Sequence, residues 1–155
     1  MVVRPATSAD YAAWIELARE VEDLFGPMAA EPSFQQGLRA AIRHNTAFCV
    51  DSPGRADNKS LDGGIVIEPQ ANEIVWLAVA KQRRRRGLGE ALLRFAIAQL
   101  DRSRDIEVQT FDQTVPAGAA ARVLYRRLGF IDARPAGANP AGIATVIMRL
   151  PALER

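Results

Sequence analysis

The sequence predicts one α/β domain over residues 1–155, with helices on the faces of a mixed β-sheet. A length of 155 residues fits one compact domain with its own core and leaves little room for a second. Apolar stripes at helical spacing alternate along the chain with short runs of strand-favouring residues. The composition, 48% hydrophobic and 25% charged, is that of a globular protein and excludes a disordered chain.

The first elements are a short strand over residues 2–4 and a helix behind it. Thr7 or Ser8 can cap this helix, and Asp10 in the first turn is favoured by the helix dipole. Gly26-Pro27 is predicted to end it. The apolar stripe that defines the helix consists of Tyr11, Trp14, Ile15, Ala18, Val21 and Phe25.

A second helix and a hairpin complete the amino-terminal half. Pro32 suits the first turn of a helix whose apolar stripe runs to His44. Residues 46–50 are predicted to form a strand, and residues 64–68 its antiparallel partner. Residues 51–64 between them are dense in Gly, Pro, Asp, Asn and Ser, which favour turns, so we expect a long loop there.

The middle of the chain predicts a strand, a helix and another strand. Residues 73–80, "EIVWLAVA", form a nearly continuous apolar run, which predicts a central strand buried on both faces. Residues 88–100 are apolar on most sides and predict a helix packed deep against the sheet. Residues 105–111, "DIEVQTF", predict the next strand.

One more helix and two strands close the chain. The helix lies between Pro116 near its start and Gly129, which can adopt the left-handed conformation that ends a helix. Residues 130–133 and 144–150 are predicted strands. The expected order is therefore β-α-α-β-β-β-α-β-α-β-β. The helical stripe consists of Ala117, Ala120, Ala121, Leu124 and Leu128.

Several functional classes conflict with the sequence. No stretch approaches the roughly 20 apolar residues that span a bilayer, and residues 1–14 lack the pattern of a secretory signal, so we expect a cytoplasmic protein without a membrane partner. Cys49, the only cysteine, is either a buried core residue or a nucleophile. His44, the only histidine, either caps a helix end or takes part in catalysis. With one of each, a zinc site is largely excluded, and we expect no metal.

The stretch "KQRRRRGLGEALLRF", residues 81–95, joins the predicted central strand to the next helix. Gly87 and Gly89 allow close backbone approach to a ligand, and the first N–H groups of a helix favour an anion. A phosphate site is one interpretation of this stretch. A nucleic-acid-binding arm and a solvated charge run are the others, although a net charge of +2 means that the basicity is local, which weakens the nucleic-acid interpretation.

Two motifs in the right order resemble the GNAT N-acetyltransferase superfamily. Arg84-Arg85-Arg86-Gly87-Leu88-Gly89 matches the pattern Arg/Gln-x-x-Gly-x-Gly/Ala that opens the helix after the central strand in that superfamily. "VLYRRLGF", residues 123–130, matches its second signature, a helix that ends in Leu-Tyr-x-x-x-Gly-Phe. The opening "VVRPATSADYAAW" is also similar, so the resemblance covers nearly the whole chain.

The resemblance implies a mostly antiparallel mixed sheet that splays in the middle, and acetyl-CoA as co-substrate. The CoA pyrophosphate would lie on backbone N–H groups from about Arg84 to Gly89, with Arg84, Arg85, Arg86 and Leu88 among the binding residues. The pantetheine arm would pair like a strand alongside residues 76–79, which include Leu77, Ala78 and Val79. Many members carry asparagine seven residues before the motif tyrosine as a cofactor contact. Gly118 occupies that position here, so the contact is missing or replaced.

The same resemblance assigns the chemistry. Tyr125 matches the tyrosine that protonates or hydrogen-bonds the CoA sulfur; the alternative is a core aromatic residue. A backbone N–H near Ala78 or Val79 would stabilise the oxyanion. Glu73 is the candidate base, since histone-acetylating members carry a glutamate in a similar setting. Alternation places Glu73 on the face of Val75, Leu77 and Val79, where its pKa would be raised, but a solvated strand-end glutamate and a water relay stay open.

The acceptor is expected to be a primary amine, on a small molecule or a peptide, and the chain is a possible homodimer because many relatives are. The first predicted helix carries Glu16, Glu20, Glu22 and Asp23, which either attract a cationic amine or form a solvated face. Two other functions stay open. One is a non-catalytic acyl-CoA sensor, suggested by Gly118, and the other is a nucleic-acid-binding module that uses Arg83 to Arg86.

Overall fold

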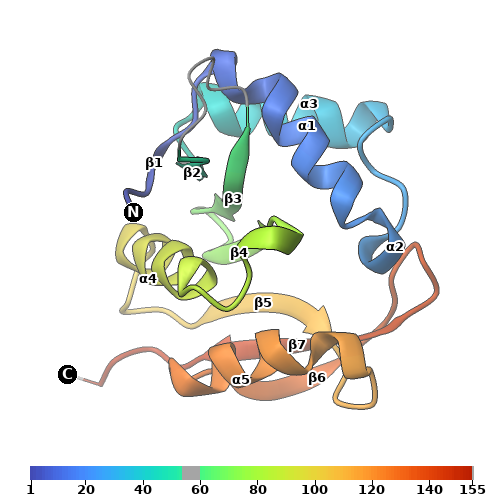
Figure 1. Cartoon of the computed structure of the whole chain (residues 1–155). Helices are drawn as coiled ribbons and strands as arrows, with labels where there is room; N and C mark the ends of the chain where they lie inside the picture. Colours follow the sequence, from blue (N-terminus) through green and yellow to red (C-terminus); the bar gives the residue numbers. More distant parts are fainter. Residues whose placement is uncertain (54–59, 155) are drawn as a thin grey trace.

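In the computed structural model, which describes residues 1–53 and 60–154, the strands form one seven-stranded sheet in the order β1-β2-β3-β4-β5-β7-β6. Neighbouring strands are antiparallel except for β4 and β5, which are parallel (Figure 1). The predicted α/β class and its mostly antiparallel mixed sheet are confirmed. The strands are β1 Arg4–Pro5, β2 Ala47–Asp51, β3 Leu61–Glu68, β4 Glu73–Val79, β5 Ile106–Phe111, β6 Ile131–Ala138 and β7 Ala144–Leu150.

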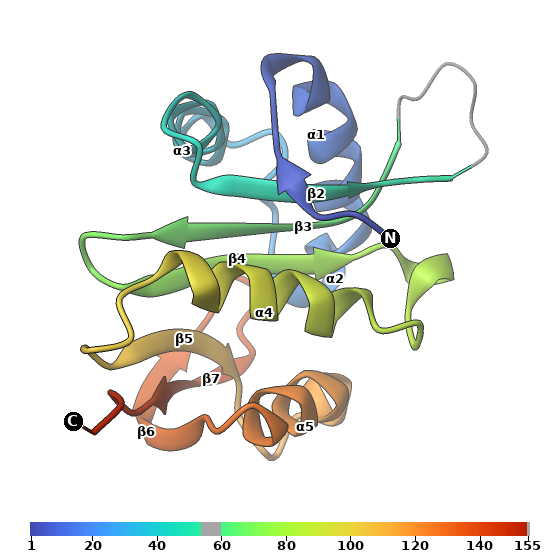
Figure 2. The same cartoon turned by 90° about the vertical axis from the view of Figure 1, so that its left-hand side faces the viewer.

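Helices cover both faces of the sheet. Figure 1 shows α4 on one side of the central strands and α1 and α2 on the other. Figure 2, turned by 90°, shows that α5 lies on the same face of the sheet as α4. The helices are α1 Tyr11–Glu20, α2 Glu22–Phe25, α3 Pro32–Arg43, α4 Leu88–Gln99 and α5 Ala119–Arg127, with short 3₁₀ turns η1 Ser8–Asp10, η2 Lys81–Arg83 and η3 Pro116–Gly118.

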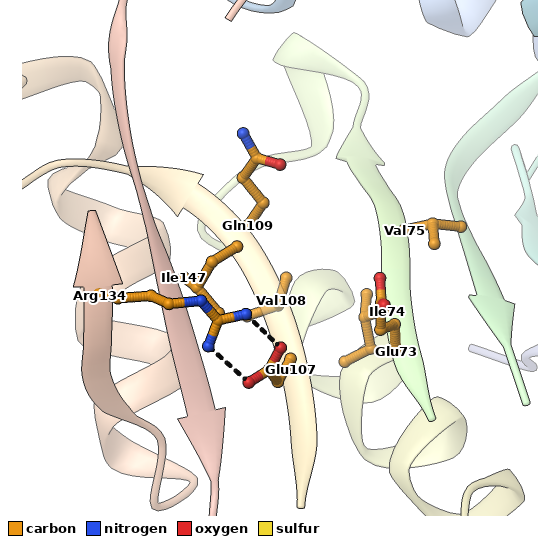
Figure 3. A pocket seen from close by; sticks show the side chains of 8 residues that line it. All are labelled: Glu73, Ile74, Val75, Glu107, Val108, Gln109, Arg134 and Ile147. Carbon is orange, nitrogen blue, oxygen red and sulfur yellow. Dashed lines mark hydrogen bonds and ion pairs between the residues drawn. The ribbon is translucent and has the colours of Figure 1, made fainter. Parts of the chain in front are cut away.

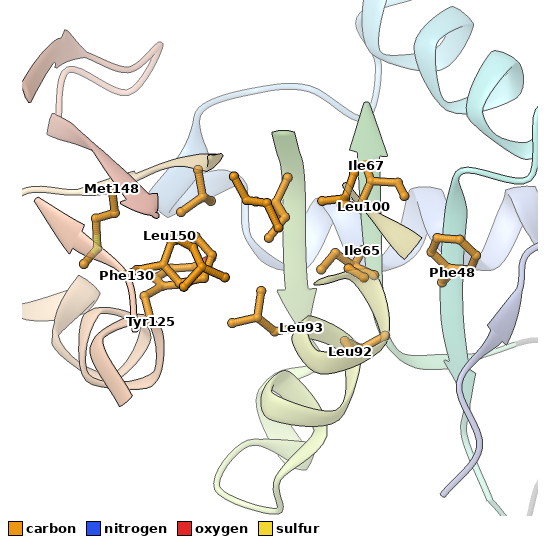
Figure 4. Packing of buried hydrophobic residues seen from close by; sticks show 14 of the residues in the cluster. Phe48, Ile65, Ile67, Leu92, Leu93, Leu100, Tyr125, Phe130, Met148 and Leu150 are labelled. Atoms are coloured by element: carbon orange, nitrogen blue, oxygen red, sulfur yellow. The ribbon is translucent and has the colours of Figure 1, made fainter. Parts of the chain in front are cut away.

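Two apolar cores follow from this arrangement, one on each face of the sheet. The core under α4 and α5 gathers apolar side chains from β2 to β5 and β7 around Leu92, Leu93 and Phe130 (Figure 4). The other core, under α1 and α3, is built around Trp14, whose ring centroid lies 5.6 Å from that of Trp76 on β4. Burial of such large apolar side chains on both faces is the main stabilising contribution.

The structure corrects several predicted boundaries. The first strand is not residues 2–4: pairing is limited to Arg4 and Pro5, because β1 meets β2 only at Cys49 and Phe48. The first predicted helix is divided at Val21 into α1 and α2. β3 already begins at Leu61, inside the predicted loop, while residues 54–59 of that loop lie outside the described residues. The predicted strand over residues 130–133 is longer, since β6 extends to Ala138.

The lone cysteine and histidine are also placed. Cys49 on β2 is fully buried, and this burial raises the pKa of its thiol to about 12, so it is a core residue and not a reactive nucleophile. His44 is exposed at the carboxyl end of α3, as the capping interpretation predicts. None of the described helices is long and apolar enough to cross a membrane. Within residues 1–53 and 60–154, no cluster of His, Cys, Asp or Glu side chains could hold a metal ion.

Candidate active site

A gap opens in the middle of the sheet between β4 and β5. The two strands pair only at Glu73 with Glu107 and Ile74 with Val108. Beyond this pair of contacts β4 continues to Val79 and β5 to Phe111 without pairing to each other (Figure 2). One edge of each strand therefore presents backbone groups that the sheet does not satisfy, and an extended ligand could pair with them.

The closed end of this gap is pinned by Asn72, which is almost completely buried. Its side-chain Nδ2 donates to the Asp101 carbonyl at 2.9 Å and the Asp105 carbonyl at 3.0 Å, and its Oδ1 accepts from the Asp101 N–H at 2.9 Å. These bonds tie the start of β4 to the loop that leads into β5. Glu73, the next residue, is thereby fixed at the apex of the gap.

The loop from β4 to α4 has the geometry of an anion site. Arg85 and Gly87 both have positive φ, 64° and 80°, and Gly87 caps the amino terminus of α4. The first bond within the helix runs from the Ala91 N–H to the Gly87 carbonyl at 3.0 Å, so the preceding N–H groups of the first turn have no carbonyl one turn back. A Cβ added at Gly87 would meet nothing within 4 Å, so the space is open to a phosphate.

Gly89 has a different reason to be glycine. A Cβ atom there would lie 3.3 Å from the Leu124 Cδ2 atom of α5, and the next residue, Glu90, forms an ion pair with Arg127 of the same helix. The first turn of α4 and the middle of α5 are therefore in contact. This brings the two sequence motifs together, because one forms the loop before α4 and the other forms α5.

The four consecutive arginines do not act alike. Arg83 pairs with the buried Asp62 at 3.3 Å, and Asp62 also accepts a hydrogen bond from the Ser52 hydroxyl at 2.6 Å. Arg84 donates from Nε to the Val79 carbonyl at 3.3 Å. Two of the four cations are thus committed to the chain itself, which leaves Arg85 and Arg86 as the freer pair. This division weakens the interpretation of the run as a nucleic-acid-binding arm.

Tyr125 lies on the face of the sheet that α4 and α5 cover. It is 4% exposed, its ring meets Phe130 edge-on with centroids 5.4 Å apart, and burial raises its pKa well above the usual range (Figure 4). Within the described part of the chain its hydroxyl has no hydrogen-bond partner. A tyrosine that stays protonated and keeps its O–H unengaged is suited to donate to an anionic sulfur.

The helix that carries Tyr125 is held by a buried cation. Arg122 is 4% exposed, and its Nη2 donates to both carboxylate oxygens of Asp132 at 3.0 and 2.9 Å. Its Nη1 reaches the Phe111 carbonyl at the end of β5, at 3.4 Å. Arg122 therefore links α5 to β5 and to the chain that follows, and it fixes the position of Tyr125 relative to the gap.

Glu73 lies on the opposite face from the one that alternation predicts. Ile67 pairs with Ile74 and Val66 pairs with Trp76, so Val75 is an extra residue in a β-bulge and is 51% exposed. Because of this bulge, Leu77 and Val79 pack under α4 while Glu73 does not, and the predicted shared face is wrong. The exposed Val75 likewise contradicts the prediction that this strand is buried on both faces.

A cleft of about 190 Å³ surrounds Glu73 at the closed end of the gap (Figure 3). Glu107 from β5 and Arg134 from β6 line it, and Arg134 holds Glu107 with two hydrogen bonds of 2.9 Å. The pairing with Arg134 lowers the pKa of Glu107. Sequence reasoning did not find these two residues, although the alternation in "IEVQTF" places Glu107 and Gln109 on one face of their strand.

Most of the acidic side chains in the first predicted helix make contacts within the chain. Glu16 pairs with Arg19 at 2.5 Å, and Glu20 accepts a hydrogen bond from the Lys81 N–H at 3.2 Å. The Glu22 carboxylate accepts from the Met28 N–H at 2.8 Å. Three of the four carboxylates are thereby engaged within the chain, which favours the interpretation of a structural and solvated face.

The chain around α2 crosses to the far side of the gap. The Phe25 ring lies 5.6 Å from the Phe111 ring at the end of β5, and Asn139, between β6 and β7, donates to the Leu24 carbonyl at 2.9 Å. A Cβ on Gly26 would lie 2.7 Å from the Pro140 Cβ. The open end of the gap is therefore bridged on this face, while the cleft around Glu73 remains.

The split in the sheet thus has a helix amino terminus beside it and Tyr125 on the face that α4 and α5 cover. A family model described as an acetyltransferase (GNAT) domain matches residues 44–132, more than half of the chain. The chain belongs to the GNAT acetyltransferase family. As a GNAT member it is an N-acetyltransferase, and the matched region contains the loop before α4, the gap and Tyr125.

Solved structures share the GNAT fold over almost their whole length. A chain of the NatC complex bound to Gag peptide and CoA superposes with a TM-score of 0.76 at 21% identity, covering 98% of each chain. The ribosomal-protein-alanine N-acetyltransferase of Brucella melitensis gives 0.73 at 19% identity, covering 97% of this chain and 99% of that one. The ribosomal-protein-S18-alanine N-acetyltransferase of Escherichia coli gives 0.69 at 21%, covering 99% and 95%. No curated protein matches this GNAT chain.

Proposed function

We propose that the chain transfers the acetyl group of acetyl-CoA to a primary amine by direct attack in a ternary complex. The N–H groups at the start of α4, with Arg85 and Arg86 beside them, would hold the pyrophosphate. The edge of β4 from Leu77 to Val79 would pair with the pantetheine arm. Bound in this way, acetyl-CoA supplies an activated thioester.

Glu73 and Tyr125 divide the proton transfers between the two faces of the sheet. The amine nitrogen forms a bond to the acetyl carbon as the carbon–sulfur bond breaks, and the amine gives up one proton. We assign that proton to the Glu73 carboxylate, which faces the open cleft. The Tyr125 hydroxyl on the opposite face gives its proton to the departing sulfur and recovers one from water. A backbone N–H of β4 beside the gap would meet the carbonyl oxygen.

One observation carries this proposal: the pairing of β4 and β5 stops at Ile74 and Val108, with Glu73 on one face and Tyr125 on the other. A gap of this kind lets the donor lie between the strands while the acceptor approaches from the opposite side to the leaving group. A protein that only senses acyl-CoA would need the gap but not two proton-transfer groups on its two faces. The arrangement therefore favours catalysis over sensing.

We propose a peptide amine as the acceptor in preference to a small-molecule amine. Proteins of the same fold are named for a bound peptide or for ribosomal-protein substrates. The test has two steps. A thermal-shift titration with acetyl-CoA should raise the melting temperature. A panel of short peptides with free amino termini, lysine-containing peptides and polyamines should then release CoA thiol with at least one member.

Glu73→Gln is the decisive variant for this assignment. It keeps the size of the side chain and removes the base, so kcat should fall by about 10²-fold while acetyl-CoA still raises the melting temperature. Binding of acetyl-CoA without thiol release from any acceptor would support the sensor instead. Unchanged turnover in Glu73→Gln would show that water, and not Glu73, takes the proton.

A further inference from the structure

The cleft around Glu73 contains two carboxylates and one guanidinium, and among the residues that the structure describes only one of these carboxylates is paired. Arg134 Nη1 and Nη2 each donate to one oxygen of Glu107, at 2.9 Å (Figure 3). Glu73 is the direct neighbour of Glu107 in the parallel pairing of β4 and β5. Within the described part of the chain, the Glu73 carboxylate has no hydrogen bond or ion pair.

The Arg134–Glu107 pair spans three strands. Glu107 is on β5 and Arg134 is on β6, with β7 between them, and Ile147 of β7 is the residue opposite Arg134. Figure 3 shows the Arg134 side chain extended across Ile147 to reach Glu107. The Arg134 side chain is 56% exposed, so the pair contributes little to stability.

We propose that Arg134 and Glu107 are a positioning pair, in which Glu107 holds the Arg134 guanidinium and so leaves the Glu73 carboxylate unpaired and able to accept the proton of the acceptor amine. This role rests on the proposed function of Glu73. Glu107 and Arg134 act through Glu73 and are not themselves proton carriers.

The argument is electrostatic. Without Glu107, the Arg134 guanidinium becomes an unbalanced cation in the same cleft, and it stabilises the charged form of Glu73, because charge-assisted pairs with arginine are strong. Glu73 then becomes a weaker base, and the cation also repels a protonated amine. Without Arg134, Glu73 and Glu107 are like charges on adjacent strands, and the proton affinity of the pair rises. The two single changes therefore act in opposite directions.

Other charged groups also lie near Glu73 and Glu107. Glu68 on β3 is its cross-strand partner, is exposed, and accepts a hydrogen bond from the Gln70 N–H at 3.1 Å. Arg149 on β7 is the cross-strand partner of Glu107 and lies 3.7 Å from Asp105. Glu68 and Arg149 are the same in all variants of the test below, so their contribution cancels in the comparison.

The test is a direct titration of Glu73 that needs no acceptor. Protein labelled with ¹³C at the glutamate carboxyl carbons is titrated by NMR, and the Glu73 resonance is the one that disappears in Glu73→Gln. Glu107→Gln should lower the midpoint of Glu73 by about 0.5 to 1 pH unit, and Arg134→Gln should raise it by a similar amount. The double variant should lie near the parent, and Arg134→Lys, which keeps the charge, should also stay near it.

The control is Arg43→Gln, which removes an exposed cation at the end of α3 and should leave the midpoint unchanged. Shifts of Glu73 in the same direction in both single variants, or no shift in either, would overturn the proposal. If the Arg134–Glu107 pair has a purely structural role, the Glu73 midpoint should not move in either single variant, and the melting temperatures should be lower. Circular dichroism melting of each variant separates the two cases.

An activity measurement distinguishes this inference from the proposed function. With acetyl-CoA and an acceptor peptide from the panel, the acidic limb of the kcat/KM profile should move in the same directions as the NMR midpoints. Full activity in Glu73→Gln would contradict both the assignment of Glu73 as the base and the positioning role of Glu107 and Arg134. Loss of activity in Glu73→Gln, with an unmoved Glu73 midpoint in Glu107→Gln and Arg134→Gln, would overturn only the positioning pair.

Discussion

Gly118 and Phe111 are so close that no side chain fits between them: a Cβ atom on Gly118 would lie 2.5 Å from the Phe111 Cβ and 3.0 Å from its Cδ2. Gly118 is buried at the start of α5, and Phe111 ends β5. An asparagine at position 118 would therefore require a smaller or displaced neighbour at position 111. The departure at Gly118 is explained by packing, and a cofactor contact through a side chain is not available here.

Gly118→Asn should consequently destabilise the protein instead of restoring a cofactor contact. Overpacking of this kind costs about 1–3 kcal/mol, which urea unfolding can measure. Phe111→Ala in the same chain should recover part of the loss, so that the cost of the double variant is smaller than the sum of the two singles. Additive costs would mean that the two residues do not compete for space.

Tyr125→Phe separates the hydroxyl from the ring. The ring keeps its contact with Phe130, so the melting temperature should change little. Without the O–H donor, kcat should fall about 10- to 100-fold at an unchanged KM for acetyl-CoA. Tyr11→Phe is the matched control, because Tyr11 lies under the Arg39 guanidinium at 4.0 Å and away from the gap. Equal turnover in both variants would count against Tyr125 as the proton donor.

Gly87→Ala tests the loop before α4. The Cβ atom of the introduced alanine would have no atom within 4 Å. However, φ at this position is 80°, and this left-handed conformation is about 1–2 kcal/mol less favourable for alanine than for glycine. The loop should relax away from the conformation that exposes its N–H groups, and acetyl-CoA affinity measured by calorimetry should fall about tenfold. Gly37→Ala, in the interior of α3 with an equally open space, should instead stabilise the protein and leave affinity alone.

Asp10 gives the protein a predictable acid sensitivity. The Arg4 guanidinium, bonded to both oxygens of Asp10 at 2.8 Å, lowers the pKa of this carboxyl in the folded state. A folded-state pKa below the unfolded value means that the stabilisation is complete above about pH 4 and is lost as the pH falls through the folded pKa. Asp10→Asn should therefore cost about 1–2 kcal/mol at pH 7 and much less near pH 2.

The control for this pH dependence is Asp23→Asn, an exposed carboxylate on α2. The free energy of unfolding, measured with urea, should differ between the parent and Asp23→Asn by the same amount at pH 7 and at pH 2. A loss in Asp10→Asn that is the same at both pH values would indicate that the carboxylate acts only through its shape.

The sequence could predict what depends on local chemistry. The loop at Gly87 and the helices α4 and α5 were predictable, because turn glycines and apolar stripes act within one turn of the chain. Tyr125 was singled out only because its motif resembles the second GNAT signature. The face on which Glu73 lies was not, because the bulge at Val75 is set by pairing with Val66 and Ile67 on another strand and leaves no local signal.

The Glu107–Arg134 pair could not be predicted for a different reason. The two residues are 27 positions apart, and they meet only because β7 inserts between β5 and β6 and Arg134 extends across it. Neither residue lies in a motif. Predicting the contact would have required the strand order as well as the strands, and strand order is a property of the whole fold.

The bulge at Val75 reverses the alternation of side chains between the two faces of the sheet part-way along β4. Before it, β4 turns the Glu73 side chain toward the cleft; after it, the same strand turns Leu77 and Val79 toward α4. Deleting Val75 would restore a regular ladder and leave each remaining side chain on its present face. If Val75 instead took its place in a regular alternation, with Leu77 and Val79 still in the core, Glu73 would lie on the side of α4, where an unpaired carboxylate is costly. One extra residue thus places the Glu73 carboxylate on the face opposite to that of Leu77 and Val79.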